Sequence, residues 1–303
     1  PALEPGMTVA GAFERQAQAC VWQMRANEEP VVDGTDPEGV HQMRVAIRRL
    51  RALVTAFSAA IDADVAAYLK TELRWMQRQL GPARDLDVFL ADTFAPLRQR
   101  LPATDSLARL ADAAESLRTE AYADARRAVR DPRYTALLLR LELWLNSGAW
   151  QKAVEPDETD PAAQLVTPFA QDILERRAKK FKKLGKKYDR LGESDLHELR
   201  IRGKKLRYAG EFFTGLFKRK DTKAYLDALE EIQDRLGAIN DAATGQELLD
   251  RIDARMRERG ESAPDTANAA GLVQGWQVAR IDRELRDFAQ VWQRFGKLKP
   301  FWR

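Results

Sequence analysis

The sequence has very little cysteine, and it lacks both a membrane-length apolar run and a recognisable leader. Its single cysteine, Cys20, excludes an internal disulfide framework and fits a reducing compartment. No apolar run approaches the roughly 20 residues that a membrane-spanning helix needs. The first residues, PALEPGMTVAGAFERQ, have neither the basic start nor the apolar stretch of a signal peptide. We therefore expect a soluble, cytoplasmic protein that does not bind membranes.

The sequence also lacks the short motifs that usually mark catalytic or metal-binding proteins. It holds two histidines, His41 and His197, and neither lies in an HExxH motif or in a cluster of cysteine and histidine ligands. No GxxxxGK(S/T) loop is present to hold a nucleotide phosphate. We therefore predict no catalytic residues, no metal site and no cofactor. Each histidine can be either a structural hydrogen-bonding group or a phosphate contact.

What the sequence does have is helical periodicity. It is 45% hydrophobic and 32% charged, apolar residues recur at helical spacing almost throughout, and no alternating strand pattern is evident. The predicted fold class is all-α. Glycine and proline at Gly34, Pro37, Gly81-Pro82 and Pro132 indicate breaks between helices. These patterns predict helices at 7–27, 37–61, 63–80, 83–101, 103–130, 132–147, 162–190, 193–218, 220–236, 239–259 and 265–295.

A repeat with a constant offset of 156 residues relates the two halves of the chain. The offset aligns, without a gap, Phe13 with Phe169, His41 with His197, Arg44 with Arg200, Arg48, Arg49 and Arg51 with Lys204, Lys205 and Arg207, Phe57 with Phe213, Gly81 with Gly237, and Asp85 with Asp241. An unbroken register over several helices predicts two similar helical bundles. We expect halves at 1–151 and 163–303, joined by a linker at 152–162 and facing each other about a pseudo-twofold axis.

The helix predicted at 37–61 carries a cationic stripe opposite an apolar one. At about 100° per residue, Arg44, Arg48 and Arg51 fall within about 80° of His41. In the second copy, His197, Arg200, Lys204 and Arg207 share a face in the same way. The basic run RRAKKFKKLGKKYDR at 176–190 also gathers its cations on one face: Arg176, Lys179, Lys180, Lys183, Lys186, Lys187 and Arg190.

Each stripe alone is compatible with an ordinary solvated face whose cations pair with carboxylates elsewhere. Like charges at i and i+4 repel by roughly 0.2–0.5 kcal/mol per pair, so their recurrence in two copies favours an anionic ligand. Cations spread over several helical turns suit an extended polyanion better than one small phosphate. The aromatic residues of these segments fall mainly on apolar faces, with Tyr208 the exception, which is unlike the grooves of single-stranded nucleic-acid binders.

Two further segments, LGPARDLDV at 80–88 and LGAINDAAT at 236–244, recur at the same offset. Their glycines predict a helix end followed by a new helix start. Asp85 and Asp241 also have a second interpretation, in which each pairs with an arginine of its stripe and holds it in place. Because helix 7–27 has nothing like the basic run 176–190, we expect the second half to contribute more of the cationic surface.

The segments HQMRVAIRRLRA and HELRIRGKKLRYAGEFF, each followed by an LGxxxD turn, resemble the CHAD family, the conserved histidine α-helical domain. The resemblance covers about residues 7–295. It implies two pseudo-symmetric helical bundles around a basic central groove or pore, and binding of inorganic polyphosphate, often at polyphosphate granules. The ligand residues that it implies are His41, Arg44, Arg48, Arg49, Arg51, His197, Arg200, Lys204, Lys205 and Arg207, with Lys179, Lys180 and Lys183 of the basic run.

We therefore predict a non-enzymatic binding module for inorganic polyphosphate. Three alternatives stay open: a nucleic-acid-binding helical protein, a phosphohydrolase or accessory domain of a CYTH-type triphosphate hydrolase, and an interaction scaffold. CHAD domains often follow a CYTH domain, whose ExExK motif is absent here. Because the chain begins with Pro1 and not with methionine, an upstream CYTH domain stays among the candidate partners, together with granule proteins.

Overall fold

The computed structural model describes residues 1–102, 104–155, 159–261 and 263–303, and the side chains of 189, 193, 238–243, 263 and 265 lie outside that description. Within the described residues every regular element is a helix, and β-structure is limited to two isolated bridges, Thr8 with Leu165 and Ile61 with Gln151. The all-α prediction is therefore confirmed. No helix in these ranges is both long and apolar enough to cross a membrane.

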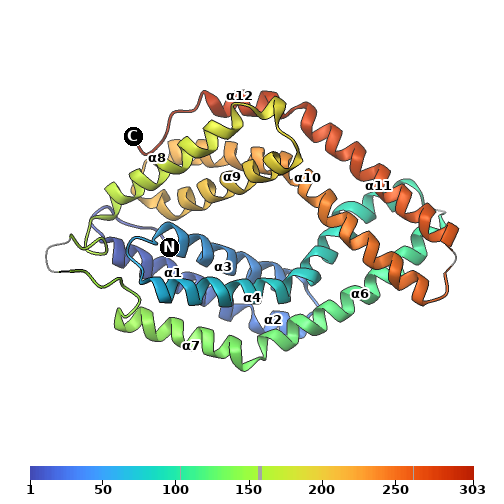
Figure 1. The fold of residues 1–303 in the computed structure, drawn as a ribbon, viewed down its shortest axis with the longest axis horizontal. Coiled ribbons are helices and arrows are strands. Elements are labelled where there is room, and N and C mark those ends of the chain that lie inside the picture. The colour runs from blue at the N-terminus through green and yellow to red at the C-terminus, as the bar shows by residue number, and fades with distance from the viewer. Residues whose placement is uncertain (103, 156–158, 262) are drawn as a thin grey trace.

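The helices follow one another in two sets. The first set is α1 (Val9–Ala26), α2 (Glu28–Asp33), α3 (Pro37–Ala56), α4 (Ala63–Val88), the π-helix η1 (Phe89–Phe94), α5 (Ala95–Arg100), α6 (Asp105–Val129) and α7 (Pro132–Ser147). The second set is α8 (Val166–Gly185), η2 (Tyr188–Arg190), α9 (Glu193–Phe213), η3 (Thr214–Leu216), α10 (Arg219–Glu258), α11 (Ala263–Arg286) and α12 (Phe288–Gly296). In Figure 1, α1, α3, α4 and α7 lie on one side of the molecule and α8, α9 and α12 on the other. Helix α10 begins beside α9 and extends to the end of the molecule where α6 and α11 lie.

Capping side chains fix where several helices begin. The side chain of Thr8 accepts a hydrogen bond from the Gly11 N–H at the start of α1, and Asp36 accepts one from the Glu38 N–H at the start of α3. Such caps satisfy N–H groups that have no partner within the first turn. With Pro37 as its first residue, α3 carries His41 in its second turn, where the cationic stripe begins.

Helix α4 runs unbroken through Gly81 and Pro82, so the predicted break at this point is wrong. Pro82 has no N–H to donate, and a proline in a helix interior costs about 3 kcal/mol. Burial offsets this cost, because Leu80, Ala83 and Leu86 on either side of it are fully buried. Helix α10 likewise continues through Gly237 as a single element of 40 residues, which contradicts the predicted break between 236 and 239.

The two sets of helices contact each other at both ends of the molecule. At one end the ring of Phe57, which caps α3, lies 5.0 Å from the ring of Phe169 in α8 and 5.8 Å from that of Phe213 in α9, measured between centroids. At the other end α6 lies beside α10 and α11 (Figure 1), and Arg255 Nη1 donates to Glu120 Oε1 at 2.7 Å. The candidate site lies between these two contacts.

Candidate anion-binding site

A cavity of about 550 Å³ lies between the two sets of helices and faces the cationic stripe of α3. Its walls come from α3, α4, η1, α9 and α10. They consist of His41, Arg44, Arg48, Arg74, Gln77, Arg78, Gly81, Arg84, Asp85, Val88, Phe89, Thr93, Arg200, Lys204, Thr244, Gly245 and Leu248. Among the described residues, seven arginine and lysine side chains thus line this central cavity together with one carboxylate, which makes this lining strongly positive.

The rotation of α3 about its axis places the stripe against the cavity. Met43, Ile47 and Leu50 on its apolar face are fully buried. Burying each such side chain stabilises the fold by about 1.5–3 kcal/mol, so this face is fixed in the core. The opposite face then has to present His41 and Arg48 to the cavity.

Arg44 is held against α4 by two contacts. Its Nη1 donates to the backbone carbonyl of Gln77 at 3.1 Å, and its Nη2 lies 3.8 Å from Asp85 Oδ1. Gly81 leaves the space for this approach, since a Cβ atom at that position would lie 3.3 Å from Arg44 Nη1. The interpretation of Asp85 as the partner of a stripe arginine is confirmed, whereas the side chain of Asp241 lies outside the described residues.

The guanidinium groups of the stripe are incompletely satisfied. The Nε atoms of Arg44 and Arg48 are buried and have no hydrogen-bond partner among the described residues. A buried donor without an acceptor costs about 1–3 kcal/mol. Burial also lowers the pKa of Arg44, and the opposing effect of Asp85 does not offset it. Oxygen atoms of an anion in the cavity would provide the missing acceptors.

His41 lies among these cations, and their charges affect the pKa of its imidazole. Burial lowers the pKa of the imidazole, and the charges of Arg84, Arg48 and Arg44 lower it further, opposed by Glu38. The imidazole is therefore mainly neutral at pH 7. An anion placed beside it would offset the arginines and favour the protonated form.

The sequence did not identify three arginines that line the cavity: Arg74, Arg78 and Arg84. All three belong to α4, and Arg74, Arg78 and Asp85 recur at helical spacing on one face. The predicted break at Gly81 divided this face between two separate helices. The single helix over 63–88 places all three along one wall of the cavity, whereas the predicted break separated Arg84 from Arg74 and Arg78.

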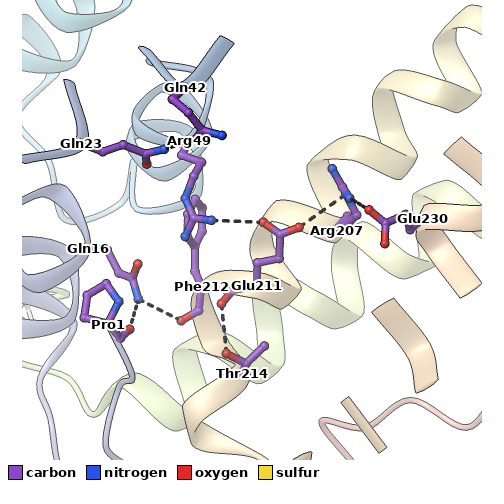
Figure 2. Close-up of polar contacts among 10 residues, drawn as sticks. All are labelled: Pro1, Gln16, Gln23, Gln42, Arg49, Arg207, Glu211, Phe212, Thr214 and Glu230. Atoms are coloured by element: carbon purple, nitrogen blue, oxygen red, sulfur yellow. Dashed lines mark hydrogen bonds and ion pairs between the residues drawn. The ribbon is translucent and has the colours of Figure 1, made fainter. Parts of the chain in front are cut away.

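Arg49 and Arg207 do not line the central cavity and instead form an ion-pair network (Figure 2). Arg49 Nη1 lies 3.6 Å from Glu211 Oε2, and Arg207 Nε lies 3.5 Å from Glu211 Oε1. Arg207 Nη1 also donates to Glu230 Oε1 at 2.7 Å. Burial raises the pKa of Glu211 even though both arginines act in the other direction. These contacts tie α3 to α9 and α10.

Three further predicted ligands also lie away from the central cavity. Arg51 donates to the side-chain carbonyl of Gln77. His197 and Lys179 are exposed, and neither is among the residues that line the cavity. His41 and His197 occupy equivalent positions in the repeat, yet only His41 borders the cavity. Equivalent positions therefore do not have equivalent surroundings.

The remaining predicted ligands, Lys180, Lys183 and Lys205, line a second pocket of about 620 Å³ between α8, α9 and the end of α3. The lining of this α8–α9 pocket is Thr55, Ala56, Ser58, Ile173, Arg176, Arg177, Lys180, Lys183, Glu198, Arg202 and Lys205. None of these residues lines the central cavity. The structure thus divides the predicted ligands among two pockets, the ion-pair network and the exposed surface.

The first half contributes most of the cations of the central cavity, so for this cavity the expected excess from the second half is wrong. Its cations are Arg44, Arg48, Arg74, Arg78 and Arg84, against Arg200 and Lys204 from the second half. One reason is that the basic residues of α8 border the other pocket. A second reason is that the repeat places Glu230 and Asp234 in α10 where α4 has Arg74 and Arg78.

The same lining decides which ions the cavity can hold. Asp85 is the one carboxylate in its described lining, and it already lies beside Arg44. Across the residues that the structure describes, no group of three or more His, Cys, Asp or Glu side chains is placed to hold a metal ion. The described lining of the cavity therefore suits an anion better than a metal cation.

Comparison with known proteins extends over nearly the whole chain. A model of the CHAD domain family matches residues 15–250. The crystal structure of the CHAD domain from the plant Ricinus communis has a TM-score of 0.80 and 29% identity, over 99% of this chain and 95% of that one. PptA from Streptomyces chartreusis has a TM-score of 0.72 and 20% identity, over 96% of this chain and 100% of that one, a likeness of fold alone.

Two proteins of Mycobacterium tuberculosis are also similar in sequence. The uncharacterized proteins MT2285 of strain CDC 1551 and Rv2226 of strain H37Rv are each 31% identical to this chain over 180 residues. The matched segment is 56% of this chain and 33% of each relative. The chain therefore matches about a third of the length of these two proteins.

Proposed function

The chain belongs to the CHAD family, and from this premise we propose that it is a non-enzymatic binding module for inorganic polyphosphate. The observation that carries the proposal is the central cavity, where the described lining brings together seven arginine and lysine side chains from both halves and one carboxylate. A linear chain of phosphates can follow such a wall of cations and release the counterions of both partners. The proposed ligand residues are His41, Arg44, Arg48, Arg74, Arg78, Arg84, Arg200 and Lys204.

The free cavity is electrostatically unfavourable, which supports a ligand of high negative charge. Arg44 and Arg48 have buried Nε atoms without acceptors, and the pKa values of His41 and Arg44 are lowered. Each phosphate unit of the chain brings acceptor oxygens that suit the planar fork of arginine. Binding would relieve the repulsion and satisfy these donors together.

The lining favours bare phosphate over nucleic acid. Proteins that bind single strands without sequence preference stack bases on aromatic side chains set within the charged groove. Phe89 is the one aromatic residue in the described lining of the cavity, and it is 3% exposed. A polyanion without bases needs no such platform, so the competing function of nucleic-acid binding is the weaker proposal.

Several wider proposals follow from the same function. Binding of polyphosphate would direct the protein to cytoplasmic polyphosphate granules and to the proteins found there, and an upstream CYTH domain would place a hydrolase beside the bound chain. We also propose that residues 1–151 and 163–303 are the two related bundles, with 152–162 as linker. The contact between Phe57 and its repeat counterpart Phe213 supports a pseudo-twofold axis, because equivalent residues meet at such an axis.

The direct test is a titration of the protein with long-chain polyphosphate at two salt concentrations. We expect binding that strengthens with chain length and weakens steeply with salt, because several phosphates exchange counterions for cationic side chains. Arg48→Gln should weaken binding, whereas Arg130→Gln, an exposed arginine at the end of α6, should leave it unchanged. Incubation with Mg²⁺ or Mn²⁺ should release no phosphate.

A competition experiment shows whether the protein prefers polyphosphate or nucleic acid. DNA or RNA with the same number of phosphates should displace polyphosphate poorly at equal salt. If nucleic acid competed as well as polyphosphate or better, the protein would be a nucleic-acid-binding protein and the proposal would be wrong. If charge reversal at Arg44 and Arg48 left all anion binding intact, the cavity would have no part in it.

A further inference from the structure

We propose that the α8–α9 pocket is a second anion-binding site, separate from the central cavity, that takes a short run of phosphates. This goes beyond the proposed function, which concerns the central cavity. The pocket measures about 620 Å³, and its cationic side chains come from α8 and α9, while Thr55, Ala56 and Ser58 at the end of α3 complete the wall.

The two sites use opposite faces of α9. Arg200 and Lys204, four residues apart, face the central cavity, whereas Glu198, Arg202 and Lys205 face the α8–α9 pocket. At about 100° per residue, these two groups of side chains point roughly 100–160° apart around the helix. One helix therefore separates two basic pockets, and a phosphate bound in one does not contact the ligands of the other.

The α8–α9 pocket is held together by a reciprocal pair of hydrogen bonds. Arg177 Nη1 of α8 donates to the backbone carbonyl of Lys205 in α9 at 2.6 Å. Arg202 Nη1 of α9 donates to the backbone carbonyl of Lys180 in α8 at 3.2 Å. Each guanidinium group is thus fixed by the neighbouring helix, which preorganises two charges that would otherwise be mobile.

The charges of the pocket are not balanced from within. Among the described residues, six cationic side chains line it with one carboxylate, Glu198, which accepts a hydrogen bond from Arg202 at 2.7 Å. Arg176 pairs with Asp172 at 2.8 Å, outside this lining. Among the described residues Lys180, Lys183 and Lys205 have no carboxylate within 4.0 Å. Burial and the charge of Arg176 lower the pKa of Arg177 to about 10. An anion between α8 and α9 would therefore offset the repulsion among the three lysines and Arg177.

The lining also indicates the class of ligand. It contains no aromatic side chain among its described residues, so nothing is present on which a nucleoside base can stack. Ser58 is exposed and adds a hydroxyl donor, and the arginine and lysine groups provide the donors that phosphate oxygens accept. A short chain of bare phosphates matches this set better than a nucleotide does.

Calorimetric titration with tripolyphosphate, compared with ATP, tests the proposal. We expect two tripolyphosphate molecules per chain and weaker binding of ATP in the α8–α9 pocket. The double variant Lys180→Gln/Lys183→Gln should lose one of the two sites, with at least a tenfold loss of affinity there. Its matched control is Lys186→Gln/Lys187→Gln, which removes two exposed lysines at the end of α8 that do not line the pocket. Circular dichroism should show unchanged helix content in both variants.

A second pair of substitutions separates this proposal from the proposed function. Arg48→Gln/Arg78→Gln should remove the central site and leave the α8–α9 site. If that variant abolished all tripolyphosphate binding, or if Lys180→Gln/Lys183→Gln bound like the wild type, there would be no second site. If only the lysine variant lost binding, the second site would stand and the proposed function of the central cavity would fail. Absence of any tripolyphosphate binding to the wild type would also refute the second site.

Discussion

Phe57 and Phe213 are 156 positions apart in the sequence and are equivalent in the repeat, and their ring centroids lie 5.8 Å apart in the fold. Both rings are fully buried, and Phe169 joins them at 5.0 Å from Phe57. This contact closes one end of the interface between the two sets of helices. It connects the end of α3, which carries the first cationic stripe, with the end of α9, which carries the second.

Substitution of Phe57 by alanine should therefore weaken the whole interface. Removing a fully buried phenylalanine ring typically costs 3–5 kcal/mol, through lost burial and the cavity that remains. We expect a loss of about this size in the free energy of unfolding, measured by denaturant titration. Leu139→Ala is a suitable control because this side chain is 58% exposed, and it should change stability by less than about 0.5 kcal/mol. Equal effects of the two substitutions would argue against a structural role for the aromatic contact.

Arg84→Gln tests a cavity arginine that the repeat does not reveal. The substitution should weaken polyphosphate binding about fivefold, since a lost charged contact costs on the order of 1 kcal/mol. The plot of log affinity against log salt should become less steep by about one unit. These values come from titrations at four or more salt concentrations, with Arg130→Gln as control. An unchanged slope would show that Arg84 does not contact phosphate.

Binding should strengthen as the pH falls towards the ordinary pKa of histidine. The pKa of His41 is lowered in the free protein, and a bound polyanion should raise it, so binding takes up a proton between the two values. Affinity then rises on acidification by at most about tenfold per pH unit. His41→Gln should remove this dependence, whereas His197→Gln, at an exposed position away from the cavity, should keep it. The same pH dependence in both variants would exclude His41 as its source.

We expect Gly81→Ala to weaken polyphosphate binding without lowering the stability of the fold. Alanine in a helix interior is more favourable than glycine by about 1 kcal/mol, so the variant should be as stable as the wild type or more so. Its Cβ atom would lie 3.3 Å from Arg44 Nη1 and should displace that guanidinium group, which weakens polyphosphate binding. Gly237→Ala is the matched control, because a Cβ atom there meets no atom of the described side chains within 4 Å. A similar loss of affinity in both variants would contradict this account of Arg44.

Cys20 offers a probe of unfolding because it is the single cysteine of the chain. Its side chain is 2% exposed, and burial raises the pKa of the thiol to about 11, although Arg49 acts in the opposite direction. At pH 8 the buried thiol is therefore almost entirely protonated, and the thiolate is the reactive form. A thiol reagent should react far more slowly with the native protein than with the unfolded protein. Comparable rates with and without denaturant would show that this part of the core opens readily.

Much of this arrangement could be predicted from the sequence because it depends on local patterns. Helical periodicity gave the all-α class, and the opposed stripes of α3 placed His41, Arg44 and Arg48 on one face. The predictions that were wrong concern features that depend on tertiary contacts. Gly81 and Pro82 normally end a helix, but burial of their neighbours carries α4 through them and brings Arg74 and Arg84 onto the same wall.

The sequence also could not predict which groups each cationic side chain contacts. Arg49 and Arg207 look like ligands in the sequence, but Glu211 lies between them only after α3 and α9 have packed together. The basic run of α8 looks like part of the same groove, yet Lys180 and Lys183 border a different pocket. Periodicity assigns a residue to a face of its helix, and the packing of helices decides what that face meets.

The contacts at both ends of the interface have a further consequence. With Phe57 packed against Phe213 at one end and Arg255 bonded to Glu120 at the other, the walls of the central cavity cannot move apart without breaking one of them. The width between these walls is therefore set by the fold. A cavity of about 550 Å³ between fixed walls suits a slender polymer, one tetrahedral unit across, better than a double helix. We expect the protein to sort polyanions by thickness as well as by charge.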